Sequence, residues 1–158
     1  MNKAVNLLQQ YISNGQLDKA LIECKKFCDQ NPSDLYLKKL LSHVYYLKEN
    51  FRSAIEISEE IIKEHPNDFD CHNNIGNYYL KLEEYEKSNQ YISKSKKINK
   101  EHPAPYQNQS EIYMKERDFL NALKEINICI SLHEKLSDEY LNYKSTIVLK
   151  IEIFIALK

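Results

Sequence analysis

The sequence predicts an all-α fold, a right-handed α-solenoid of stacked helix-turn-helix repeats, on three observations. Tyrosine recurs every 34 residues, at Tyr11, Tyr45, Tyr79 and Tyr113. Other positions keep the same period, with an aromatic residue or leucine six residues after each tyrosine and a small residue three further on. Only 2 glycines and 4 prolines punctuate the 158 residues, which suits a helical array. A fixed period of this length is typical of units that bury their apolar faces only by stacking on one another.

The first repeat is expected over residues 1–34, as helices near 2–14 and 18–30. Gly15 stands between them, where glycine adopts turn conformations at the lowest cost. Asp18 falls near the start of the second helix, where a carboxylate interacts favourably with the helix dipole. Pro32 closes the repeat.

The second and third repeats are expected over 35–68 and 69–102. Gly76, like Ala20, Ala54 and Ala122 elsewhere, is small enough to let two helices approach closely. The third and fourth repeats are less apolar than the first two, because polar residues occupy places that are apolar elsewhere: Ser88, Asn89, Ser95 and Gln109. We therefore expect the second helix of repeat three and the first helix of repeat four to form the weakest junction.

The fourth repeat is expected over 103–136. It opens with Pro103 and Pro105, which the first helical turn tolerates because its N–H groups lack helical partners.

The last segment, residues 137–158, is expected to be a C-terminal helix that begins at Ser137-Asp138. One apolar stripe should cover the end of the array: Tyr140, Tyr143, Ile147, Ile151 and Phe154. A second stripe, on roughly the opposite face, consists of Leu149, Ile153 and Leu157. This second stripe is either a set of incidental exposed residues on a capping helix or an association surface.

The periodic residues also carry a family resemblance. The first unit shows Leu7, Tyr11, Gly15, Leu17, Ala20, Cys24, Phe27 and Pro32, and the third shows Ile75, Gly76, Tyr79, Tyr85 and Ile92. This pattern resembles the tetratricopeptide repeat, and the resemblance covers residues 1 to about 136. It implies a single domain over 1–158 and a protein-protein interaction module, such as an adaptor, a scaffold or a co-chaperone-like protein.

The resemblance further implies that the first helices line a concave groove that binds a peptide or protein segment. Carried over by register, the candidate groove residues are Asn6, Gln9, Lys39, His43, Tyr46, Asn73, Asn74, Asn77, Gln107, Asn108 and Glu111. Asparagine occupies one register position in three of the four repeats, and its amide can both donate to and accept from a peptide main chain. These amides either form such a ladder or are simply solvated.

A narrower function within the family, the clamp that holds acidic chaperone tails, is a poor match. The corresponding residues here are Lys39, His43, Asn74, Ala104 and Asn108. Two match, and the two cationic positions of the third helix are missing. The sequence therefore favours a partner other than an acidic tail.

Several other function classes find no support in the sequence. The formal net charge is −1, so the chain lacks a strongly basic nucleic-acid footprint, and the lysines between Lys94 and Lys100 are expected to be a solvated outer face. We find no catalytic motif and expect no enzyme activity, cofactor or metal; Cys24 and Cys28 match apolar positions of other repeats. No stretch is long and uncharged enough for a membrane span, and we expect a cytoplasmic protein.

The sequence thus predicts a module that binds a protein or an extended peptide in its groove. The alternative is a self-associating scaffold, a weak homo-oligomer that uses the C-terminal helix.

Overall fold

The computed structural model describes residues 2–136 and 143–157, and the regular structure within these ranges is helical throughout. The first helices of the four repeats are α1 (Asn2–Ser13), α3 (Leu35–Leu47), α5 (Phe69–Lys81) and α7 (Ala104–Lys115). The second helices are α2 (Leu17–Gln30), α4 (Phe51–Glu64), α6 (Tyr85–Ile98) and α8 (Phe119–Leu136), and α9 (Tyr143–Ala156) follows. The prediction of an all-α solenoid of helix-turn-helix repeats is confirmed.

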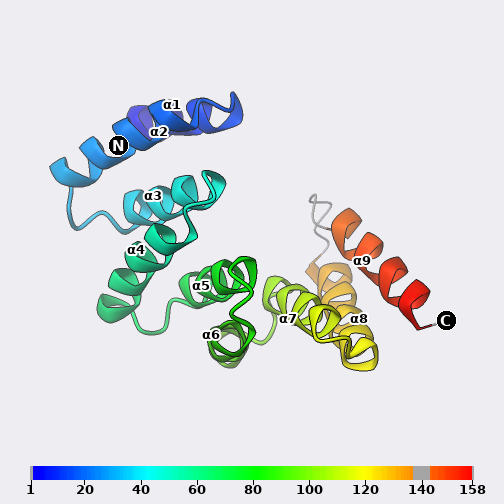
Figure 1. Ribbon diagram of the computed structural model, residues 1–158. Helices are drawn as coiled ribbons and strands as arrows, with labels where there is room; N and C mark the ends of the chain where they lie inside the picture. The colour runs from blue at the N-terminus through cyan, green and yellow to red at the C-terminus, as the bar shows by residue number, and fades with distance from the viewer. Residues whose placement is uncertain (1, 137–142, 158) are drawn as a thin grey trace.

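The repeats follow a curved path from α1 to α9 (Figure 1). Figure 1 shows α3, α5 and α7 on the inner side of this curve and α4, α6 and α8 on the outer side. The inner, concave face is therefore built from first helices, and the outer face from second helices.

The turns within the four repeats share one backbone conformation. Gly15, Glu49, Glu83 and Arg117, which lie 34 residues apart, all have positive φ angles, of 69°, 59°, 60° and 63°. Such a left-handed residue ends a helix, and it is easiest for glycine because a side chain strains the conformation. Only the first repeat has glycine at this position, so the other three turns carry strain that the packing of their helices must offset.

Side-chain caps define the starts of several helices. The carboxylate of Asp34 accepts a hydrogen bond from the Leu37 N–H (3.1 Å), and that of Asp68 from the Cys71 N–H (2.9 Å). These caps satisfy backbone donors that have no partner inside the helix. They set the register of α3 and α5, the two helices at the centre of the inner face.

The closest helix contact lies inside the third repeat, at Gly76. A Cβ atom on Gly76 would lie 2.5 Å from Cδ1 and 2.6 Å from Cγ1 of Ile92 on α6. Ile92 is fully buried and cannot move into solvent. The expectation that Gly76 permits a close approach of the two helices is thereby met.

Buried serines connect the helices within three repeats. The hydroxyl of Ser42 donates to the Ala54 carbonyl (3.0 Å), and that of Ser110 donates to the Ala122 carbonyl (2.8 Å). In the third repeat the direction is reversed, since Ser88 on the second helix donates to the Gly76 carbonyl (2.6 Å). Serine at these positions therefore satisfies its hydroxyl locally, and burying it costs little.

The junction between repeats three and four is polar but paired. The Gln109 side-chain amide donates to Asn89 Oδ1 at 2.5 Å, and the buried Ser95 hydroxyl donates to the Phe69 carbonyl at 2.8 Å. The polar residues that prompted the expectation of a weak junction thus have partners. The relative strength of this junction stays a prediction.

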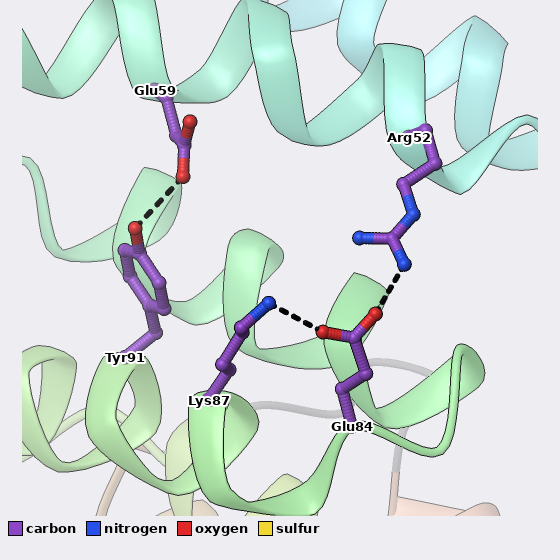
Figure 2. A network of polar contacts seen from close by, with 5 residues as sticks. All are labelled: Arg52, Glu59, Glu84, Lys87 and Tyr91. Atoms are coloured by element: carbon purple, nitrogen blue, oxygen red, sulfur yellow. Dashed lines mark hydrogen bonds and ion pairs between the residues drawn. The ribbon is translucent and has the colours of Figure 1, made fainter.

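On the outer face, polar pairs connect successive repeats. Figure 2 shows the contacts between α4 and α6: Arg52 pairs with Glu84, Lys87 lies 2.7 Å from the same carboxylate, and the Tyr91 hydroxyl donates to Glu59 at 2.9 Å. Asp18 pairs with Lys48 across the preceding junction. Lys96 and Glu125, 2.7 Å apart, form the equivalent pair across the following one.

The packing of α9 corrects the assignment of its two faces. Ile153 is fully buried against Ala122, Ile126 and Cys129 of α8, and Leu149 packs on the same cluster. Ile151 and Phe154, which were expected to cover the array, are 52% and 48% exposed. The prediction that Leu149 and Ile153 project outward is wrong, whereas Leu157 is exposed as expected.

The physical reason lies in the length of the preceding helix. α8 has 18 residues, whereas α2, α4 and α6 have 14 each. Because α8 is longer, the following helix does not continue the 34-residue phase on which the face assignment rested. The predicted helix start at Ser137-Asp138, and Tyr140, lie outside the described residues.

None of the helices within the described residues combines the length and the apolar character that a membrane span requires.

Candidate binding groove

The eleven candidate groove residues all lie on the inner, first helices: α1, α3, α5 and α7. Asn6, Gln9 and His43 are exposed, and the other eight are half-buried: Lys39, Tyr46, Asn73, Asn74, Asn77, Gln107, Asn108 and Glu111. Half-burial is what the inner side of a curved array imposes, because neighbouring first helices converge there. The structure brings these residues onto one face but leaves them with different partners.

Three side-chain hydrogen bonds connect neighbouring first helices along this face. Gln9 Nε2 donates to the Tyr36 hydroxyl (3.2 Å), and Asn108 Nδ2 donates to Asn73 Oδ1 (2.9 Å). The Thr146 hydroxyl of α9 donates to Gln107 Oε1 (3.0 Å). The amides of Asn73, Asn108 and Gln107 are thus engaged in contacts between repeats.

Asn74 and Asn77 differ from these amides. Neither side chain makes a hydrogen bond or ion pair within residues 2–136 and 143–157, and both are half-buried on the inner side of α5. An amide that is partly desolvated and unpaired gains free energy when a ligand supplies a donor or an acceptor. Asn6 is also unpaired within those ranges, but it is exposed and retains its hydration.

The cations of the inner face already have partners. Lys39 Nζ lies 2.6 Å from Asp68 and 3.8 Å from Asp70, and Lys81 lies 4.0 Å from Glu111. Burial alone would lower the pKa of Lys39, but the hydrogen bond to Asp68 and the nearby negative charges outweigh it and hold this pKa above its ordinary value. Lys39 is therefore a charged residue whose charge is neutralised inside the chain.

Asp68 performs two tasks at this point. Burial would raise its pKa, but the hydrogen bonds from Lys39 and from the Cys71 N–H, together with the Lys39 charge, lower the pKa below its ordinary value. The same carboxylate therefore caps α5 and neutralises Lys39. Sequence reasoning missed this role, although an aspartate directly before a helix is a recognisable capping signal.

An aromatic cluster lies beside these amides, formed by His43, Tyr46, Phe51 and Tyr78. The ring of Tyr46 stacks on Tyr78 at 5.3 Å and on His43 at 6.1 Å. Desolvation lowers the pKa of His43, so its ring is neutral at pH 7. The exposed part of the cluster is consequently a neutral, flat surface of the kind that packs against an apolar side chain.

Tyr78 is the member of this cluster that sequence reasoning did not select. It is buried, its hydroxyl lies 3.2 Å from the Ser42 hydroxyl, and burial raises its pKa to about 12. Its signal in the sequence was weak, because it directly precedes the periodic Tyr79 and a pair of adjacent tyrosines does not reveal which one faces which helix.

The described residues contain no cluster of three or more His, Cys, Asp or Glu side chains that could hold a metal ion. Cys24, Cys71 and Cys129 are buried free thiols, and burial raises the pKa of Cys71 to about 12 and that of Cys129 to about 11. Such thiols are protonated at neutral pH and behave as small core residues.

The lysines near the end of α6 are on the outer side of the array. Lys96 is paired with Glu125, and its Nζ lies 4.5 Å from the centre of the Tyr106 ring. Lys97 and Lys100 line a shallow hollow of 320 Å³ beside them. Two exposed lysines on a convex surface are too few to make a basic track for nucleic acid.

Comparison with known proteins places the geometry in context. Residues 13–95 match the family model described as anaphase-promoting complex, cyclosome, subunit 3. No curated protein sequence matched the chain.

Solved structures with the same fold share little sequence identity with the chain. The APC/C hetero-tetramer Cut9–Hcn1 matches with a TM-score of 0.88 and 14% identity, over 98% of this chain but 30% of that one, so the chain spans less than a third of its length. BtubC (BKLC) from P. vanneervenii matches with a TM-score of 0.80 and 14% identity, over 99% and 72% of the two chains. MamA matches with a TM-score of 0.72 and 18% identity, over 86% and 80%. At such identities the likeness extends to the fold alone.

Proposed function

Since the chain belongs to the family described as anaphase-promoting complex, cyclosome, subunit 3, a family of tetratricopeptide-like repeats, we propose that it holds an extended segment of another protein in its inner groove. Repeat folds of this type are protein-interaction scaffolds and are typically non-enzymatic. The adaptor role and the groove as its site are our inference for this chain.

The observation that supports the groove most is the pair of uncommitted amides on α5. Asn74 and Asn77 are half-buried and unpaired within the described residues, whereas Asn73 and Asn108 bond to each other. Adjacent amides that can each donate and accept suit a peptide main chain, which offers both groups at every residue. We infer that α5 supplies the main-chain contacts and that the amides between repeats keep the inner helices in position.

The charges and the aromatic cluster define the segment further. Lys39 and Lys81 are paired with carboxylates of the chain itself, so an acidic ligand would have to displace Asp68, Asp70 or Glu111. An uncharged segment avoids this cost. The surface formed by His43 and Tyr46 suits an apolar side chain of the same segment. We therefore propose a neutral peptide with an apolar anchor over α3 and main-chain contacts over α5.

A library of random twelve-residue peptides displayed on phage provides a direct test. Peptides selected on the chain should be enriched in apolar residues and depleted in aspartate and glutamate. The variant Asn74→Ala, Asn77→Ala should bind a selected peptide more than about tenfold more weakly in fluorescence anisotropy, because two net hydrogen bonds of about 1 kcal/mol each are lost.

Asn127→Ala is the matched control, because Asn127 is an exposed amide on the outer helix α8. The variant should bind like the unchanged chain. If the α5 double variant keeps full affinity while the outer-face change Lys96→Glu abolishes binding, the inner groove is not the site.

A further inference from the structure

The side of α9 that faces away from α8 carries a patch of exposed apolar side chains. Val148, Ile151, Phe154 and Ile155 are 47%, 52%, 48% and 67% exposed. Figure 1 shows α9 at the end of the array, with α7 and α8 on one side of it and no helix on the other. We call these four residues the α9 patch.

The α9 patch is centred on Ile151. Val148, Phe154 and Ile155 are three or four residues from Ile151, and residues at these spacings lie on one helix face. Leu149 and Ile153 fall on the opposite face, where they pack on α8. The patch is therefore a contiguous surface, and contiguous exposed apolar surfaces commonly mark interaction sites.

The α9 patch has a different charge on each edge. Lys150 and Glu152 are the chain neighbours of Ile151, and each residue step turns an α-helix by about 100°, so they border the patch on opposite sides. Lys150 Nζ lies 5.9 Å from the Phe154 ring, which places the positive charge on the Phe154 edge. Glu152 is exposed on the other edge, beside Val148 and Ile155.

We propose that the α9 patch binds the α9 patch of a second copy of this chain, with the two helices side by side and parallel about a twofold axis. A twofold contact joins the same surface of both copies, so the surface must complement itself. In the parallel arrangement the Lys150 edge of each helix meets the Glu152 edge of the other, which forms two opposite-charge contacts around an apolar centre. The antiparallel arrangement would bring lysine to lysine and glutamate to glutamate, which is unfavourable.

This contact is separate from the proposed peptide groove, since it uses α9 rather than the inner faces of α3 and α5. The patch is small compared with a stable interface, which buries roughly 800 Å² per partner. Association is therefore weak and concentration-dependent.

Sedimentation equilibrium of the intact chain over a wide concentration range tests the proposal. The average mass should rise from monomer toward dimer, and Ile151→Lys should abolish the rise without lowering the melting temperature. Ile22→Lys is the matched control, because Ile22 is 65% exposed on α2 and should leave association unchanged. A mass that stays monomeric throughout, or a rise that survives Ile151→Lys, overturns the proposal.

Charge reversal tests the parallel pairing. Lys150→Glu and Glu152→Lys should each weaken association about tenfold, because each creates like-charge contacts. An equal mixture of the two variants should restore it, since every glutamate then meets a lysine. If either single variant associates as tightly as the unchanged chain, the helices are not parallel and the proposed pairing is wrong.

Discussion

At the scale of single residues, two positions show how little space or polarity the core tolerates. Gly76 is the point at which α5 and α6 come closest, and no other residue fits there without a shift of Ile92. His72 is buried with its Nε2 donating to the Pro66 carbonyl (2.9 Å), while its Nδ1 is buried and has no hydrogen-bond partner within the described residues. Each makes a measurable prediction.

Gly76→Ala should lower the free energy of unfolding by about 1–3 kcal/mol, because overpacking forces neighbouring atoms to move. Urea denaturation measures this loss. The combination Gly76→Ala, Ile92→Val removes one of the two clashing carbons and should recover part of the loss. A single Gly76→Ala variant as stable as the unchanged chain would contradict the close contact.

The stability of the chain should fall as the pH drops below about 6.5, the ordinary pKa of histidine. Burial, followed by the nearby Lys94 charge, lowers the pKa of His72 in the folded state, although the Pro66 carbonyl and Asp68 act in the opposite direction. The unfolded chain then binds the proton more readily, so stability is complete above this pH and is lost between the unfolded and the lower folded pKa.

Urea unfolding at a series of pH values measures the effect. His72→Phe keeps a ring of similar size but does not titrate, so its stability should depend less on pH in this window. His43 also has a lowered pKa and contributes the remainder. An unchanged pH profile in His72→Phe would exclude His72 as the cause.

At the scale of the elements, the left-handed turn residues separate the first repeat from the others. Gly15 adopts its φ of 69° without a side chain, whereas Glu83 and Arg117 adopt the same conformation with one. All three are exposed, so the difference is in the backbone and not in packing.

Glu83→Gly and Arg117→Gly should each raise the free energy of unfolding by about 0.5–1 kcal/mol, since glycine relieves the left-handed strain at some cost in chain entropy. Gly15→Ala should have the opposite effect, and a Cβ there would touch no other group within 4 Å, so any loss is conformational. Thermal melting of the three variants provides the comparison. A destabilised Glu83→Gly would show that its side chain contributes more than the strain removes.

At the scale of the whole molecule, the array is a row of repeats in which each contacts only its neighbours. The last apolar surface, on α8, is covered by Leu149 and Ile153 of α9. In such a chain a defect at one end destabilises the nearest repeat first.

Ile153→Ala should destabilise repeat four by about 2–5 kcal/mol, the usual cost of truncating a buried isoleucine. Amide hydrogen exchange should become faster in α7 and α8 and change little in α1–α4. Ile22→Ala, an exposed isoleucine on α2, should leave exchange unchanged throughout. Faster exchange spread evenly over all helices would mean that the array unfolds as one unit.

Much of this architecture could be read from the sequence because it depends on local and periodic information. The recurrence of tyrosine every 34 residues, and glycine, proline and aspartate near the helix ends, predicted the four helix pairs and placed the groove residues on the inner helices. Helix starts, turns and the face of a regular repeat all follow from residues close together in the chain, and each repeat supports the register of the next.

What only the tertiary structure decided are the pairings between helices. The sequence could not show that Asn108 bonds to Asn73 while Asn74 has no such partner, or that Asp68 neutralises Lys39, because these contacts depend on the angle between neighbouring repeats. It also misassigned α9, whose apolar residues lie all around the helix. Periodicity cannot choose a face when every face is apolar, and the choice is made by the surface of α8 against which Ile153 fits.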